Sequence, residues 1–166
     1  RYARDVVGSF MQARHCVTGI SNYGIAGDYC GAAVHVLVKT DLPSRIVRRL
    51  LRWKPSPSWS TRRFCNYLPE NTDLIVCCHL STLPAALAAA TSRGLPIILV
   101  AHGIEVWREW PADVARSINA CRCVVAVSTY TANAIRHRIS NDVPVHVISP
   151  AVVVRRFTPS LLAKET

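Results

Sequence analysis

The sequence lacks an apolar run long enough to cross a membrane. A spanning helix needs about 20 consecutive apolar residues, and the longest candidate, residues 80–90, is shorter and rich in alanine. We expect no signal peptide, because the chain opens directly in helix-like sequence. It also opens without methionine. We therefore expect a cytoplasmic protein whose true start precedes residue 1.

Acidic side chains are scarce. The chain has 10 Asp and Glu against 20 Lys and Arg, which gives a formal net charge of +10 at pH 7. This balance favours an acidic partner such as nucleic acid, anionic lipid or a phosphorylated substrate. No nucleic-acid-binding motif accompanies the charge, so we expect no nucleic-acid partner.

The seven cysteines do not have the C-x2-4-C spacing of a structural zinc site. Cys77 and Cys78 are adjacent, and Cys121 and Cys123 alternate within an apolar run. Side chains at such spacings on strands point to opposite or poorly converging faces. We therefore expect no metal, and reduced thiols that pack as small hydrophobic groups.

Short apolar strands alternate with helical segments along the chain. The patterns predict strands at residues 16–20, 33–38, 73–78, 96–101, 123–127 and 143–148, with a loop at 22–27. They predict helices at residues 1–12, 44–54, 82–92, after Pro111, and at 131–138. Near-continuous apolar strands between helices are typical of a parallel sheet covered on both faces. The predicted fold class is therefore α/β: a doubly wound, mostly parallel Rossmann-like sheet with helices on both faces.

A glycine-rich phosphate loop is missing as well. The first strand of such a fold, with the loop that follows it, should precede the helix at residues 1–12. No G-x-G-x-x-G occurs elsewhere in the chain. This argues against a dinucleotide-binding dehydrogenase.

Polar residues follow three of the predicted strands. His79, His102 and Ser128 each come directly after an apolar strand. Ligands of open parallel sheets bind outside the carboxyl ends of the strands. We therefore expect one sheet with these three residues at the same edge.

His102 is the strongest of these candidates. Gly103 follows it and allows the backbone to pass close to a ligand, and a neutral imidazole can donate a hydrogen bond to a sugar hydroxyl or a phosphate. The alternative is a histidine that bonds only to nearby backbone. For His79 the alternative is a cap on the next helix.

A basic amphipathic helix is predicted at residues 44–54. Its arginines fall on one side of a helical wheel and its apolar residues on the other. This pattern suits an anionic membrane surface, although a helix packed on the sheet with a solvated arginine face has the same pattern. The candidate membrane-surface residues are Arg45, Arg48, Arg49, Arg52 and Lys54.

Taken together, these segments resemble family-4 glycosyltransferases of the GT-B fold. The segments that carry the resemblance are residues 1–3, 14–18, 73–79, 101–107, 125–131 and 147–159. Residues 1–159 are similar to the N-terminal, acceptor-side domain, and 160–166 to the start of the interdomain linker. The family's donor-binding domain is not in this sequence. The closing motif departs from the family, with Ser149, Ala151 and Val153 where proline, glycine and aspartate are usual.

The resemblance implies a retaining transfer of a sugar from a nucleotide-sugar donor to a glycan, lipid or small-molecule acceptor. It implies no cofactor and no catalytic metal, and a half-domain that is inactive alone. The histidine matching His102 contacts the transferred sugar in the family, so His102 is the catalytic candidate. The substrate-binding candidates are His79, Gly103, Glu105, Ser128 and Thr131.

Two other interpretations remain open. One is a non-catalytic Rossmann-like module that binds a membrane or a partner, or a degenerate fragment. The other is a different GT-B enzyme, such as a nucleotide-sugar epimerase. If the basic helix binds lipid, the protein is expected at the inner face of the membrane.

Overall fold

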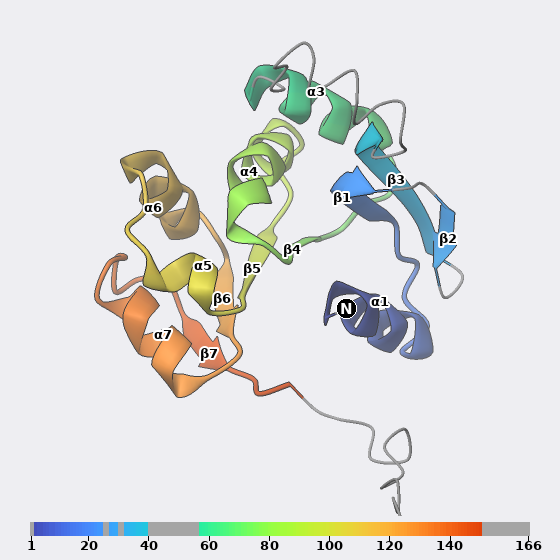
Figure 1. Ribbon diagram of the computed structural model, residues 1–166. Helices are drawn as coiled ribbons and strands as arrows, with labels where there is room; N and C mark the ends of the chain where they lie inside the picture. Colours follow the sequence, from blue (N-terminus) through green and yellow to red (C-terminus); the bar gives the residue numbers. More distant parts are fainter. Residues whose placement is uncertain (1, 25–26, 30–31, 40–56, 151–166) are drawn as a thin grey trace, which may run out of the picture.

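Helices surround two β-sheets in the computed structural model, which describes residues 2–24, 27–29, 32–39 and 57–150 (Figure 1). The first part of the chain contains α1 (Tyr2–Gln12), β1 (Gly19–Gly24), β2 (Gly27–Tyr29) and β3 (Ala32–Lys39). The second part begins with α3 (Pro57–Tyr67). It continues with β4 (Ile75–Cys77), η1 (Leu80–Thr82), α4 (Leu83–Ser92), β5 (Ile97–Ala101), α5 (Ile104–Trp107), α6 (Ala112–Asn119), β6 (Cys123–Ala126), α7 (Thr129–Arg136) and β7 (Val145–Val147).

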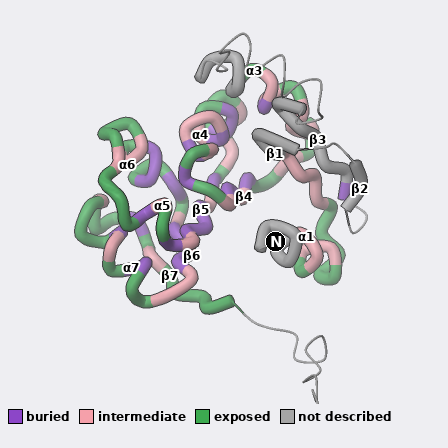
Figure 2. Tube along the Cα trace, in the orientation of Figure 1, coloured by how far each residue is buried: buried purple, intermediate pink, exposed green. Residues whose placement is uncertain are grey.

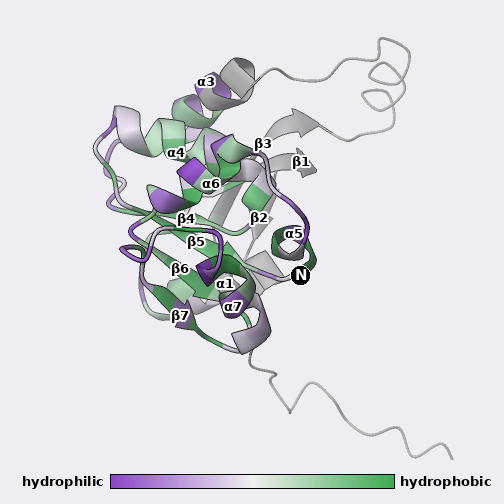
Figure 3. Ribbon diagram, turned by 90° about the vertical axis from the view of Figure 1, so that its left-hand side faces the viewer, coloured by the Kyte–Doolittle hydropathy of each residue, from purple (hydrophilic) through white to green (hydrophobic). Residues whose placement is uncertain are grey.

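The larger sheet has four parallel strands in the order β4-β5-β6-β7. Parallel neighbours need crossover connections, and α4, α6 and α7 lie in those connections. Figure 3 shows apolar β5 and β6 at the centre of this layer. The predicted α/β class with a Rossmann-like parallel sheet is confirmed.

The prediction of one sheet is wrong for the described strands. β1, β3 and β2 form a separate three-stranded sheet, in which β2 runs antiparallel to β3. In a doubly wound order, the strand that precedes the first helix would lie between β1 and β4. None of the described strands occupies that place, so no strand ladder joins the two sheets within these residues.

The hydrophobic core lies between the four-stranded sheet and its helices. Leu99 and Val124, on β5 and β6, are fully buried, as are Ile118 on α6 and Ile135 on α7. Figure 2 shows the buried positions concentrated on β4, β5, β6 and the adjacent face of α4. Each such side chain contributes roughly 1.5–3 kcal/mol relative to exposure, so this packing fixes the strand ends that carry the candidate site.

Local signals explain where α4 ends and where α7 begins. Gly94 ends α4: its φ is 63°, and the amides of Gly94 and Leu95 donate to the carbonyls of Thr91 and Ala90. Ser128 is the N-cap of α7, and its hydroxyl accepts from the Thr131 amide at 3.1 Å. The end of α4 and the start of α7 therefore follow from single residues that the sequence displays.

Other boundaries differ from the predictions. β1 begins at Gly19 rather than residue 16, and the predicted loop at 22–27 overlaps β1 and β2. The sequence patterns missed α3, and they missed η1 and α5, which have only three and four residues. α3 starts at Pro57, and proline suits a first helical position.

The predicted basic helix, with Arg45, Arg48, Arg49, Arg52 and Lys54, lies outside the described residues. Among the helices that the structure does describe, none is both long and apolar enough to span a membrane.

Candidate functional site

The three predicted strand-end residues lie at one edge of the four-stranded sheet. His79 comes two residues after β4, His102 directly follows β5, and Ser128 comes two residues after β6. These strands are parallel and in register with their neighbours. The loops that leave their carboxyl ends therefore meet at the same edge.

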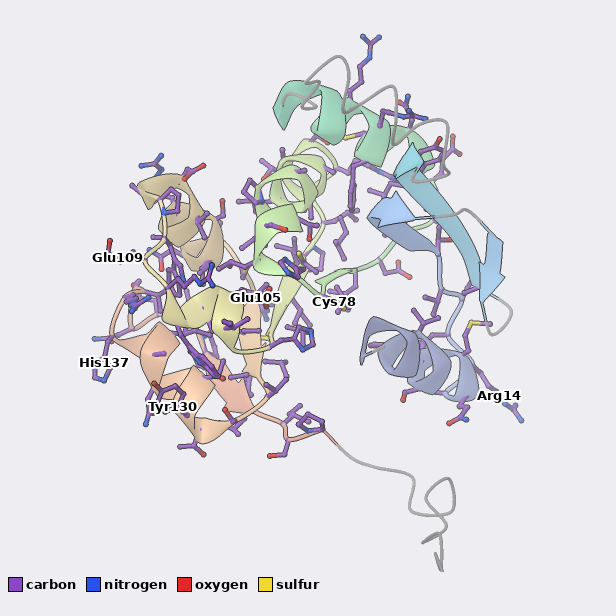
Figure 4. The ribbon with its side chains drawn as sticks, viewed as in Figure 1. Arg14, Cys78, Glu105, Glu109, Tyr130 and His137 are labelled. Atoms are coloured by element: carbon purple, nitrogen blue, oxygen red, sulfur yellow. The ribbon has the colours of Figure 1, made fainter. Side chains whose placement is uncertain are left out.

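Glu105 connects two of these loops. Its Oε1 accepts a hydrogen bond from the His102 backbone amide at 3.1 Å. Its Oε2 lies 3.0 Å from His79 Nε2 and accepts from the Leu80 amide at 3.4 Å. The side chain is only 10% exposed, so both oxygens act inside the protein. Glu105 thus ties the segment after β4 to the segment after β5 (Figure 4).

Both ring nitrogens of His79 have partners. Nδ1 accepts from the Ser81 backbone amide at 3.1 Å and lies 2.9 Å from the Ser81 hydroxyl. A nitrogen that accepts from an N–H carries no proton, so Nε2 carries it and donates to Glu105. His79 is the N-cap of η1, which is the capping alternative that the sequence left open.

His102 is half-buried, and burial lowers the pKa of its imidazole below the ordinary value of 6.5. The negative charge of Glu105 and a hydrogen bond with the Cys78 backbone oppose this shift in pKa, and nearby His79 adds to it. The net direction is downward. The ring is therefore neutral at pH 7, the state in which an imidazole donates a hydrogen bond without carrying charge.

Gly103 is required at its position by geometry. Its φ is 137°, a conformation that L side chains rarely adopt, and a Cβ there would lie 3.0 Å from Cζ2 of Trp107. Gly103 is also the N-cap of α5. The glycine therefore lets the chain turn sharply after His102 and lets the Trp107 indole pack back over that turn.

Arg138 holds the other end of α5, a role that the sequence did not reveal. Its Nη1 donates to the carbonyl oxygens of Val106 at 3.1 Å and Arg108 at 2.7 Å. Its guanidinium lies over the Trp110 ring, 5.1 Å from the centroid. No local motif marks Arg138, because its partners lie about thirty residues earlier.

Ser128 and Thr131 form the first turn of α7. The Ser128 hydroxyl donates to Thr131 Oγ1 at 3.0 Å while it accepts from the Thr131 amide. Thr131 is fully buried. A direct contact between Thr131 and a substrate therefore requires this turn to rearrange.

The cysteines on and beside the four-stranded sheet are weak nucleophiles. Burial raises the pKa of Cys77, raises that of Cys78 to about 11, and raises that of Cys121 to about 12. The six cysteines in the described ranges are free thiols. Over the same ranges, no three His, Cys, Asp or Glu side chains gather in a way that could hold a metal ion.

A parallel sheet whose strands alternate with helices defines an α/β domain of the Rossmann-like class. The family model Glycosyltransferase Family 4 matches residues 1–156, and the chain belongs to that family. No curated protein sequence matches it.

Proposed function

We propose that this chain is the acceptor-side half of a glycosyltransferase that moves a sugar from a nucleotide-sugar donor to an acceptor with retention of configuration. Membership in glycosyltransferase family 4 supports the reaction class. The observation that carries the proposal is the neutral imidazole of His102 at the carboxyl edge of the sheet. A separate donor-binding domain would hold most of the nucleotide.

In this proposal His102 donates a hydrogen bond to the transferred sugar as charge develops in the transition state. Glu105 binds the His102 amide, and Gly103 shapes the turn, so the backbone that carries the ring is held in place before the donor arrives. His79 and Ser128 shape the acceptor side of the same edge. The basic residues 44–54 bring the protein to the inner face of the membrane.

The test is His102→Ala in a chain that also carries a donor domain. Removing one well-placed hydrogen-bond donor of this kind lowers turnover by roughly 10²–10³-fold. Turnover and thermal melting are measured on the same preparation. We expect turnover to fall by this factor while the melting temperature stays close to that of the wild type.

His146→Ala is the matched control, because His146 is an exposed histidine on β7. It should leave both turnover and melting unchanged. If His102→Ala keeps turnover within a few-fold of the wild type, His102 is not a site residue. If melting collapses together with turnover, the histidine has a structural role and the proposal fails.

A further inference from the structure

Two exposed aromatic side chains stand together at the edge that carries His102. Trp107 on α5 and Tyr130 on α7 have ring centroids 5.2 Å apart and planes at 84°, an edge-to-face pair. Their exposed fractions are 45% and 69%. Large aromatic groups usually bury much of their surface, so an exposed pair on one face indicates a contact surface.

The pair is held in position from both sides. Glu105 anchors α5 to the segment after β4, and Arg138 binds the carbonyl oxygens at the other end of α5. The Trp107 indole packs directly over Gly103, and Tyr130 rests against Trp107. Ordering these side chains on binding therefore costs little conformational entropy.

The pair is also continuous with the candidate site. Trp107 contacts the Gly103 turn, and Gly103 is the neighbour of His102. Tyr130 is the second residue of α7 and comes two residues after Ser128, and α7 lies beside α5 (Figure 4). A ring placed against these aromatics therefore borders the position at which His102 would meet a sugar.

We propose that Trp107 and Tyr130 form a stacking platform for a pyranose ring of a saccharide acceptor; this rests on the proposed transferase function. A pyranose has an apolar C–H face and a rim of hydroxyls. The C–H face of the pyranose packs on the exposed face of one aromatic ring, and the second ring, nearly perpendicular to the first, stands beside it as a wall. Thr129 and Asn133, exposed neutral polar residues on either side of Tyr130 along α7, suit the hydroxyl rim.

The experiment titrates the 166-residue chain with methyl pyranosides of glucose, galactose, mannose and N-acetylglucosamine. Sorbitol serves as the control ligand, because it has hydroxyls but no ring face. Binding is followed by the indole ¹H–¹⁵N signal of Trp107, assigned with Trp107→Phe. At least one pyranoside should shift this signal saturably, and sorbitol should not.

Three variants test the platform. Trp107→Ala and Tyr130→Ala should each weaken binding by about tenfold, the size typical of a lost stacking contact. Leu74→Ala, which alters an exposed hydrophobic residue just before β4, should change nothing. Trp107→Leu keeps an apolar side chain without a π-face, and it should bind as weakly as Trp107→Ala.

Two results would overturn the platform. The first is that no pyranoside shifts the Trp107 signal, or that Trp107→Leu binds as well as the wild type. The second is that Trp107→Ala and Tyr130→Ala instead abolish sedimentation with phosphatidylglycerol vesicles, which would make the pair a membrane anchor. Neither result bears on His102, because pyranoside binding by this chain and turnover in a chain with a donor domain are separate measurements.

Discussion

Glu105 shows how one side chain organises the candidate site. Its two oxygens reach the backbone of His102 and Leu80 and the ring of His79. A buried carboxylate is stable only when such partners compensate for its lost hydration. The residue that best defines the geometry of this edge is therefore the carboxylate between the two histidines.

Replacing Glu105 with alanine should lower the free energy of unfolding by about 1–3 kcal/mol, because the amides of His102 and Leu80 lose their acceptor. Urea denaturation measures this change. Glu109→Ala is the matched control: Glu109 is exposed and lies on the same segment, and its replacement should stay within about 0.5 kcal/mol. Equal effects of the two substitutions would show that Glu105 does not hold the loops together.

The lowered pKa of His102 predicts a pH dependence of stability. The folded protein binds this proton less readily than the unfolded chain, whose pKa is near 6.5. The free energy of unfolding therefore falls as the pH drops below 6.5 and through the lowered pKa of the folded state, and it recovers above 6.5. His102→Gln should remove this contribution.

The measurement compares urea denaturation of the wild type and of His102→Gln at about pH 7.5 and about pH 5. The difference in stability loss between the two proteins isolates the contribution of His102 from that of the other titrating groups. The wild type should lose more stability than the variant over this range. Equal losses would mean that His102 titrates as it does in the unfolded chain.

At the scale of elements, short helices determine the geometry of the candidate site. α5 has only four residues and follows a glycine whose φ of 137° other residues rarely adopt, and a helix of that length is not stable by itself. Glu105, Arg138 and the Trp107 packing stabilise it through tertiary contacts. Whether such a short helix forms is therefore determined by its tertiary contacts rather than by its own helix propensity.

The basic segment at residues 44–54 carries a separate prediction. Anionic vesicles should sediment the protein and release it at raised salt, because screening weakens contacts between arginine and lipid headgroups. Changing Arg48, Arg49 and Arg52 together to glutamine should abolish sedimentation. A control that removes the same charge from exposed positions elsewhere, Arg62, Arg116 and Arg122, should keep it. Equal binding by both triple variants would mean that only net charge matters.

At the scale of the whole molecule, the acceptor and donor sides of a GT-B enzyme close around the sugar, and groups from both sides are needed for transfer. We therefore predict that the 166-residue chain alone transfers no sugar and binds nucleotide sugars only weakly. Isothermal titration calorimetry with UDP- and GDP-sugars measures this. A micromolar Kd would contradict the prediction and would place donor-binding groups within this chain.

The sequence by itself determined the parallel sheet and the positions of His102, Gly103 and Ser128 at its edge. Runs such as residues 96–101 and 123–127 are apolar on both faces, and a covered parallel sheet is what buries them. The end of α4 at Gly94 and the capping of α7 by Ser128 were likewise local, because a cap depends on neighbours within one turn.

Only the tertiary structure decided which side chains meet at that edge. Glu105 pairs with His79 from another loop, Arg138 reaches Val106 across 32 residues, and Trp107 meets Tyr130 from a different helix. It also decided that the described strands form two sheets rather than one. Periodicity reports which face of an element is apolar, whereas such contacts depend on where packing of the core places the loops.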